Sequence, residues 1–150
     1  MKTQHATILL ERAYEAPPER VFAEFADPVV RARWSTPAED VLIYEEADFR
    51  TGGKDVFRCG PKENPKFCGE TRYLLIVPNT RVVSSEVLEV HGNCIAIALT
   101  TLDFEPIHEA TNLTVTVQVV SFIGPGIFQG YESGNRSALE NLSQHLSSGK

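Results

Sequence analysis

Asp55 is the residue whose type and position best suit acid–base chemistry. It lies in an alternating segment, so its carboxylate shares one strand face with Phe57 and Cys59. A partly desolvated carboxylate on such a face can act as a general base. The alternative is a structural aspartate near a strand end, paired with Lys54 or Arg58. The ready supply of ion-pair partners favours this second interpretation.

The other metal-ligating residue types lack the spacing that a metal site requires. The four histidines lie near the termini or in expected loops and form no HxH or HxxxH pair; they are His5, His91, His108 and His145. The acidic cluster from Glu39 to Asp48 lacks the Asp-x-Asp-x-Asp-Gly arrangement of a calcium loop. We interpret both groups as solvated side chains and expect no metal ion.

Motifs for nucleotide binding and for acyl-enzyme chemistry are not found. The sequence contains no GxGxxG, GxxxxGK[ST] or GxSxG segment. Gly124-Pro125-Gly126 precedes a helical segment, but it is too short for a nucleotide loop and lacks the lysine. We therefore expect no cofactor.

Composition restricts the classes of partner. With 150 residues, 42% hydrophobic and 23% charged, the chain is typical of one globular domain, expected to span 1–150. The net charge of −6 disfavours nucleic acid and anionic membranes, which both attract basic surfaces. No apolar leader segment or membrane-spanning run is visible. The odd number of cysteines without CxxC spacing fits reduced thiols, so we expect a cytoplasmic location.

Hydrophobic periodicity predicts the elements that position these groups. Residues 7–14 alternate as a strand, and two short helices follow, one opened by Pro17-Pro18-Glu19 and the other by Asp27-Pro28. From Val41 onward the period is that of strands. The later strands are expected at 55–59, 71–77, 82–90, 95–105 and 113–122, and a long helix at 127–146.

This order of elements predicts an α+β fold. One two-helix insertion and one terminal helix cannot supply the alternating pattern of a parallel sheet, so the six to seven strands must be antiparallel. The last helix presents one apolar stripe, formed by Phe128, Tyr131, Ala138, Leu142 and Leu146, to one face of the sheet. Two glycines, Gly130 and Gly134, interrupt this helix. Each lowers helix propensity by about 1 kcal/mol relative to alanine, which favours sites where the backbone closely approaches a strand or a ligand.

Several segments resemble the START-like (SRPBCC) superfamily, and within it the branch named after the activator of the heat-shock protein 90 ATPase. Each match is short, but together they appear in the family's order over nearly the whole chain. They are Arg12–Phe22, Ala26–Pro28 with Ala32–Trp34, Asp48–Gly53, Tyr73 with Val77–Val82, Thr101–Pro106 with Thr111–Thr114, and Gly134–Asn135 with Leu139 and Leu142.

The resemblance implies a helix-grip fold, in which a curved antiparallel sheet wraps the long C-terminal helix around a deep cavity. Members of the superfamily bind lipids, sterols, polyketides or hormones, and some are cyclases or aromatases. The eukaryotic activator carries a further domain that engages the chaperone. This chain has no room for one, so the resemblance carries that activity over poorly.

Two departures from the family pattern concern the cavity. The second tryptophan of the family's Arg-Trp-Trp segment is Ser35 here, and the tryptophan after the helix glycine is Asn135. Small polar side chains at both positions predict a wider cavity and a ligand with a polar handle. The ligand-binding residues implied by the resemblance are Trp34, Ser35, Phe57, Tyr73, Phe128, Tyr131 and Asn135, although core packing explains the aromatic members almost as well.

Three functional hypotheses follow. The first is binding of a small apolar or amphipathic molecule in the cavity. The second is a cyclase or aromatase, for which Asp55 is the candidate acid–base group. The third is an interaction with a chaperone partner, as the family name implies. The sequence does not identify the ligand, because cavity shape depends on side-chain geometry that periodicity does not give.

Overall fold

In the computed structural model, which describes residues 2–148, seven strands form one antiparallel sheet in the order β1-β7-β6-β5-β4-β3-β2. The strands are β1 (Gln4–Tyr14), β2 (Asp40–Glu46), β3 (Lys54–Pro61), β4 (Phe67–Val77), β5 (Arg81–Val90), β6 (Asn93–Ile107) and β7 (Ala110–Ser121). The helices are α1 (Pro18–Ala26), α2 (Pro28–Trp34) and α3 (Gly126–Ser148).

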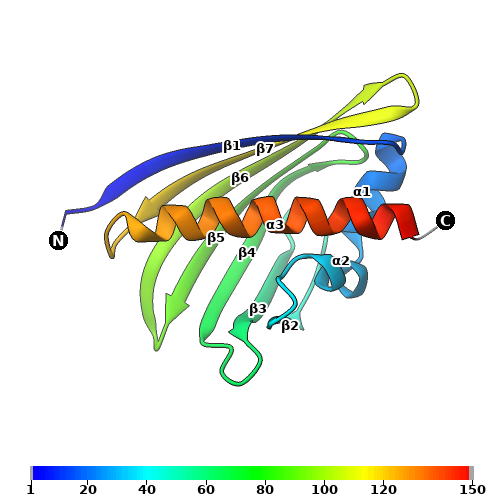
Figure 1. The fold of residues 1–150 in the computed structure, drawn as a ribbon. Helices are drawn as coiled ribbons and strands as arrows, with labels where there is room; N and C mark the ends of the chain where they lie inside the picture. Colours follow the sequence, from blue (N-terminus) through cyan, green and yellow to red (C-terminus); the bar gives the residue numbers. More distant parts are fainter. Residues whose placement is uncertain (1, 149–150) are drawn as a thin grey trace.

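The sheet curves around α3, as Figure 1 shows. Helix α3 runs along the concave face, and α1 and α2 lie together near its C-terminal end. The predicted α+β helix-grip class is therefore confirmed. None of the described helices is both long and apolar enough to cross a membrane.

Alternation along the strands builds the core beneath α3. On β7, Leu113, Val115, Val117 and Val119 all point inward and are at most 2% exposed. Leu142 of α3 is fully buried in the same cluster of apolar side chains. Strand period and helix period thus place their apolar residues on facing surfaces, which is what makes the two layers pack.

Helix α2 is short, but its start is well defined. The Asp27 carboxylate accepts hydrogen bonds from the backbone N–H groups of Val29 (2.9 Å) and Val30 (3.5 Å), and a proline occupies the first turn. This cap fixes the rotation of the helix. As a result Arg31 and Trp34, one turn apart, both lie buried under the sheet's concave face.

Several strands begin earlier than their apolar pattern predicts, among them β1 and β4. β1 starts at Gln4 and β4 at Phe67, where strands were expected from residues 7 and 71. In these two extensions only Phe67 is large and apolar, so the apolar alternation is lost. Their backbone groups still pair with β7 and β5 respectively, because sheet hydrogen bonds do not depend on side-chain polarity.

The two helix glycines do not mark a close approach of the helix backbone to a strand or a ligand, so that prediction is wrong. Gly130 and Gly134 are both exposed, and a Cβ added at either position would meet nothing within 4 Å. Neither a strand nor the cavity approaches them. They therefore lower the stability of the helix without a packing gain within the described chain.

Replacing Gly130 or Gly134 with alanine should raise the free energy of unfolding by about 1 kcal/mol each, because alanine has the higher helix propensity and fits without contact. Urea denaturation measures the change. Gly92→Ala is the matched control, and it should destabilise, since Gly92 holds φ at +80° in the turn between β5 and β6. Destabilisation by the helix variants would show that something packs against this face.

Candidate functional site

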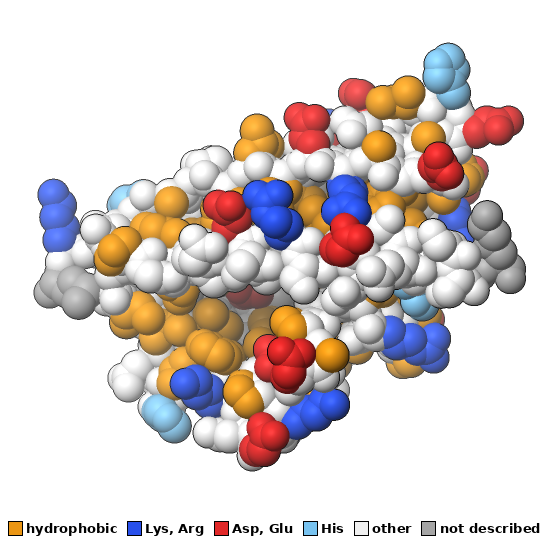
Figure 2. All heavy atoms as spheres, viewed as in Figure 1, with side chains coloured by type: hydrophobic (Ala, Val, Ile, Leu, Met, Phe, Trp, Pro, Cys, Tyr) orange, Lys and Arg blue, Asp and Glu red, His pale blue; other side chains and the backbone are white. Residues whose placement is uncertain are grey.

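A cavity of about 290 Å³ lies on the concave face, over β2 to β6 and beside α1 and α2. In the space-filling view the surface is hollowed beneath α3, with apolar side chains gathered there (Figure 2). The cavity is displaced toward the two short helices from its expected place between sheet and C-terminal helix. Its wall is part apolar and part polar. The apolar side chains include Leu42, Phe57, Val82 and Leu102. The polar and charged ones include Arg31, Tyr44, Asp55, Thr71, Ser84 and Glu86.

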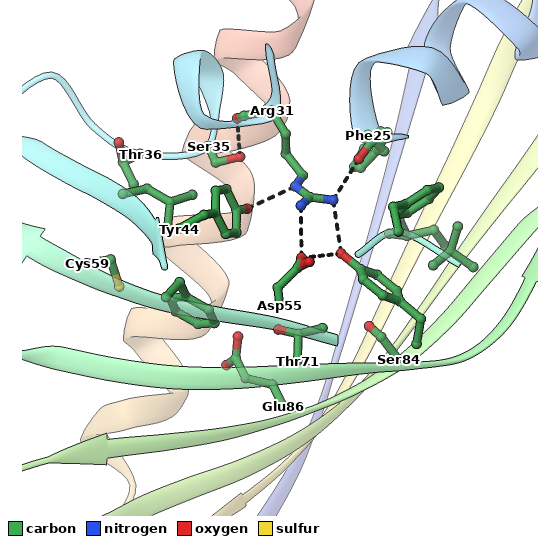
Figure 3. Close-up of a pocket in the computed structure, with 16 residues that line it drawn as sticks. Phe25, Arg31, Ser35, Thr36, Tyr44, Asp55, Cys59, Thr71, Ser84 and Glu86 are labelled. Carbon is green, nitrogen blue, oxygen red and sulfur yellow. Dashed lines mark hydrogen bonds and ion pairs between the residues drawn. The ribbon is translucent and has the colours of Figure 1, made fainter. Parts of the chain in front are cut away.

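A buried ion pair joins Arg31 of α2 to Asp55 of β3 at this wall (Figure 3). Nη2 of Arg31 donates to Oδ2 of Asp55 over 2.8 Å, and the two side chains are only 10% and 3% exposed. The Tyr73 hydroxyl accepts from Nη1 of Arg31 over 2.9 Å and donates to Oδ2 of Asp55. The Asp48 backbone N–H donates to Oδ1. Such added hydrogen bonds are what make a buried pair tolerable.

The remaining donors of Arg31 are also used. Nε donates to the Tyr44 hydroxyl over 2.9 Å, and Nη1 donates to the Phe25 carbonyl over 2.7 Å. Burial alone lowers the pKa of Arg31, but Tyr44, Tyr73 and Asp55 outweigh it and raise the pKa above its usual value. Arg31 is therefore a permanent cation whose charge Asp55 neutralises.

The predicted ion pair of Asp55 with Lys54 or Arg58 is wrong. Lys54 and Arg58 point to the opposite face of β3, where they pair with glutamates on β2 and β4 and in the bulge of β2. The true partner is Arg31, 24 residues away in the chain. Because three donors already engage its carboxylate, the geometry favours a structural role for Asp55 over that of a general base.

A second carboxylate, that of the partly buried Glu86 on β5, also lines the cavity. The strand register places Asp55, Thr71 and Glu86 in one row across β3, β4 and β5. The Tyr131 hydroxyl of α3 donates to Oε2 of Glu86 over 2.8 Å. Within residues 2–148, no cation lies within ion-pair distance of this carboxylate, and Oε1 accepts no hydrogen bond.

The two carboxylates therefore differ in their electrostatic surroundings. Burial raises the pKa of Glu86, and the hydrogen bond from Tyr131 only partly opposes this rise. Burial also raises the pKa of Tyr131, so its hydroxyl keeps its proton and remains a donor. Cys59 shares this wall, and burial raises the pKa of its thiol to about 11, which makes it a poor nucleophile.

The structure brings together part of the predicted ligand-binding set. Ser35, Phe57 and Tyr73 lie on the cavity wall, and Tyr131 reaches it through Glu86. Trp34 packs in the core with its ring 4.9 Å from that of Phe25.

The last two members of the set belong to α3. Phe128 is partly buried and packs against the hydrophobic core, and it does not line the cavity. The amide nitrogen of Asn135 donates to the Tyr131 carbonyl one turn earlier in its own helix. Neither side chain is among those that form the wall.

Glu86 and Arg31 were not predicted as site residues from the sequence, although the sequence pattern around each one marks it. On β5 the inward positions alternate as Val82, Ser84, Glu86 and Leu88, so a charge stands where apolar side chains are expected. Arg31 lies one turn before Trp34 on the buried side of a short helix. A charged residue in register with an apolar face is the pattern to look for.

Phe57 depends on a glycine in the neighbouring strand. Gly69 pairs with Phe57 across β3 and β4, and a Cβ at Gly69 would overlap the phenyl ring. The missing side chain at Gly69 lets the ring lie against β4 and form an apolar part of the wall.

Within residues 2–148, no cluster of three or more His, Cys, Asp or Glu side chains could hold a metal ion.

These features define a class: a helix-grip protein whose curved sheet and long C-terminal helix leave a cavity lined by both apolar and polar groups. The chain belongs to one family within this START-like class. The profile of the family described as "Activator of Hsp90 ATPase homolog 1-like protein" matches residues 15–147. The resemblance seen in the sequence motifs is thus confirmed.

Solved structures agree with this assignment. A protein from Rhizobium loti is 32% identical, with a TM-score of 0.86 over 96% of this chain and 99% of that one. A protein from Rhizobium leguminosarum is 29% identical, with a TM-score of 0.87 over 97% of each chain. A protein of the dynemicin biosynthetic locus shares the fold at 19% identity, with a TM-score of 0.69 over 96% of this chain and 48% of that one. No curated protein matches the chain.

Asp55→Ala should destabilise the protein by about 3 kcal/mol or more, because it leaves the Arg31 charge buried without its counter-ion. Thermal and urea unfolding measure the loss. Arg136→Ala is the control, since it breaks an exposed ion pair with Glu132 and should cost less than about 0.5 kcal/mol. Equal effects of the two substitutions would refute the structural role of the buried pair.

Glu86→Gln should stabilise the protein near neutral pH. The pKa of Glu86 is raised in the folded state above its ordinary 4.5, so the native state holds the proton more tightly than the unfolded chain. The contribution of Glu86 to stability is therefore full below pH 4.5 and is lost as the pH rises through the folded pKa.

The measurement is the difference in unfolding free energy between Glu86→Gln and the wild type across this pH range. The advantage of the variant should be greatest at pH 7 and should vanish below pH 4.5. Using the difference cancels the titration of all other groups. An advantage that does not change with pH would contradict the raised pKa.

Proposed function

We propose that this protein binds a small amphipathic molecule in the cavity on the concave face of its sheet. The observation that carries the proposal is the composition of the wall, where Phe57, Val82 and Leu102 face a few convergent polar groups. Pockets for small molecules combine these two features. A volume of about 290 Å³ suits a compact ligand of roughly a dozen non-hydrogen atoms.

The polar groups of the wall differ in their availability to a ligand. Arg31 and Asp55 satisfy each other, whereas the Thr71 and Ser84 hydroxyls make no hydrogen bond within residues 2–148. The Tyr44 hydroxyl accepts from Arg31 and keeps its own proton for a ligand acceptor. We assign polar recognition to these hydroxyls and to Glu86.

The other residues of the expected ligand-binding set are given supporting roles. Phe57 and Tyr73 form the walls, and Ser35 lines the rim with its hydroxyl donating to the Arg31 carbonyl over 2.5 Å. Tyr131 orients Glu86. Trp34 and Phe128 pack in or against the core, and Asn135 bonds to the Tyr131 carbonyl within α3, so we assign these three no direct ligand contact.

A cyclase-type reaction is the second candidate function. The observation in its favour is the paired Glu86 and Tyr131, because a carboxylate of raised pKa beside a hydroxyl can move a proton. Glu86 replaces Asp55 as the candidate acid–base group in that case. A chaperone partner is less well supported, since the unpaired polar groups converge on a cavity and not on the outer surface.

Binding should be blocked by filling the cavity. Thr71→Phe places a large ring on the inner face of β4, and it should weaken binding of a neutral probe, 4-phenylbutan-1-ol, at least about tenfold. Arg72→Phe puts the same ring on the outer face of the same strand and should leave binding unchanged.

Amide chemical shifts in a titration followed by NMR give both the affinity and the place of binding. Shifts of β3, β4 and β5 that disappear in Thr71→Phe are the expected result. The proposal fails if the wild-type protein shows no saturable shifts, or if both phenylalanine variants bind the probe as well as the wild type.

A further inference from the structure

The charges on the cavity wall do not cancel. The lining contains one cation, Arg31, and two carboxylates, Asp55 and Glu86. Asp55 neutralises Arg31 through the 2.8 Å ion pair, which leaves Glu86 as the uncompensated charge. An ionised carboxylate among apolar side chains is costly unless a cation pairs with it.

The geometry of Glu86 leaves one oxygen available. Oε2 accepts the hydrogen bond from Tyr131, which fixes the orientation of the carboxylate. Oε1 has no hydrogen-bond partner in the described chain, and the carboxylate lines the cavity beside Thr71, its cross-strand partner on β4 (Figure 3). A positioned donor on one oxygen and a vacant second oxygen form a receptor for one more donor.

From this arrangement we propose that the ligand is an amphipathic amine, whose ammonium group pairs with Oε1 of Glu86 while its apolar part lies against Phe57, Val82 and Leu102. The proposal rests on the proposed function, since it names the chemical class that the same cavity takes. The remaining ammonium protons are accepted by the hydroxyls of Thr71, opposite Glu86 on β4, and of Ser84, two residues before Glu86 on β5. No covalent step is involved.

Other ligand classes fit the wall less well. An anionic ligand finds no available cation, because every nitrogen of the Arg31 guanidinium already donates to protein acceptors. It would also face the Glu86 carboxylate at close range. A neutral ligand leaves Glu86 either protonated or without a counter-charge. The net charge of −6 further favours the approach of a cation.

The titration of Glu86 gives the inference a second signature. Protonation of Glu86 removes the charge that holds the ammonium, so amine affinity should fall as the pH drops through the raised pKa. Tyr44, Tyr131 and Cys59 stay neutral through that fall, because burial raises the pKa of each. The titratable or charged groups that face this wall are Tyr131 from α3, Tyr44 from β2, Asp55 and Cys59 from β3, and Arg31 from α2.

The test compares three probes with one carbon skeleton: 4-phenylbutylamine, 4-phenylbutan-1-ol and 4-phenylbutyrate. Isothermal titration calorimetry at pH 7.5 should rank the amine tightest and the carboxylate weakest. Glu86→Gln should lower amine affinity about tenfold or more, to the level of the alcohol, as expected for losing a hydrogen bond to a charged group. The readout is the ratio of amine affinity to alcohol affinity, which should fall to about one in Glu86→Gln.

Glu89→Gln is the matched control, because it removes the same charge from the outer face of the same strand. It should leave the ranking unchanged. The inference is overturned if the wild type binds the alcohol as tightly as the amine, or if the amine preference survives in Glu86→Gln. In both cases alcohol binding still upholds the proposed function. Failure of all three probes to bind overturns the proposed function together with the inference.

Discussion

The buried ion pair between Arg31 and Asp55 is the constraint on which the site depends. It ties α2 to β3, and Tyr73 and Tyr44 extend the tie to β4 and β2. Because each charge is useful only with the other in place, the helix and the strands must come together as one unit. That unit forms the end wall of the cavity.

Glu86 lies in the same row of the sheet as Asp55, but its carboxylate has no ion pair within residues 2–148. Asp55 has three donors, one of which is the Arg31 cation, whereas Glu86 has one tyrosine hydroxyl and an open cavity. The first arrangement stabilises the fold. The second one costs stability, since burial raises the pKa of Glu86 without a compensating cation. Proteins retain such unfavourable groups mainly at functional sites, where a bound ligand supplies the counter-charge that the protein lacks.

Much of the fold followed from local sequence rules. Period-two alternation in residues 82–90 and 113–122 predicted two strands that lie at 81–90 and 110–121, and the apolar stripe of the last helix predicted its contact with the concave face. The Asp27-Pro28 signal predicted the start of α2 at the correct residue. These features succeed because a cap or a period depends on residues within a few positions of each other.

The sequence by itself thus determined the class of fold and the family. Only the tertiary structure decided that Asp55 pairs with Arg31, that Glu86 has no cation beside it within residues 2–148, and that Trp34 lies in the core and not on the cavity wall. The reason is physical. Which charges meet depends on strand register and on the rotation of α2, and both are set by packing between segments far apart in the chain.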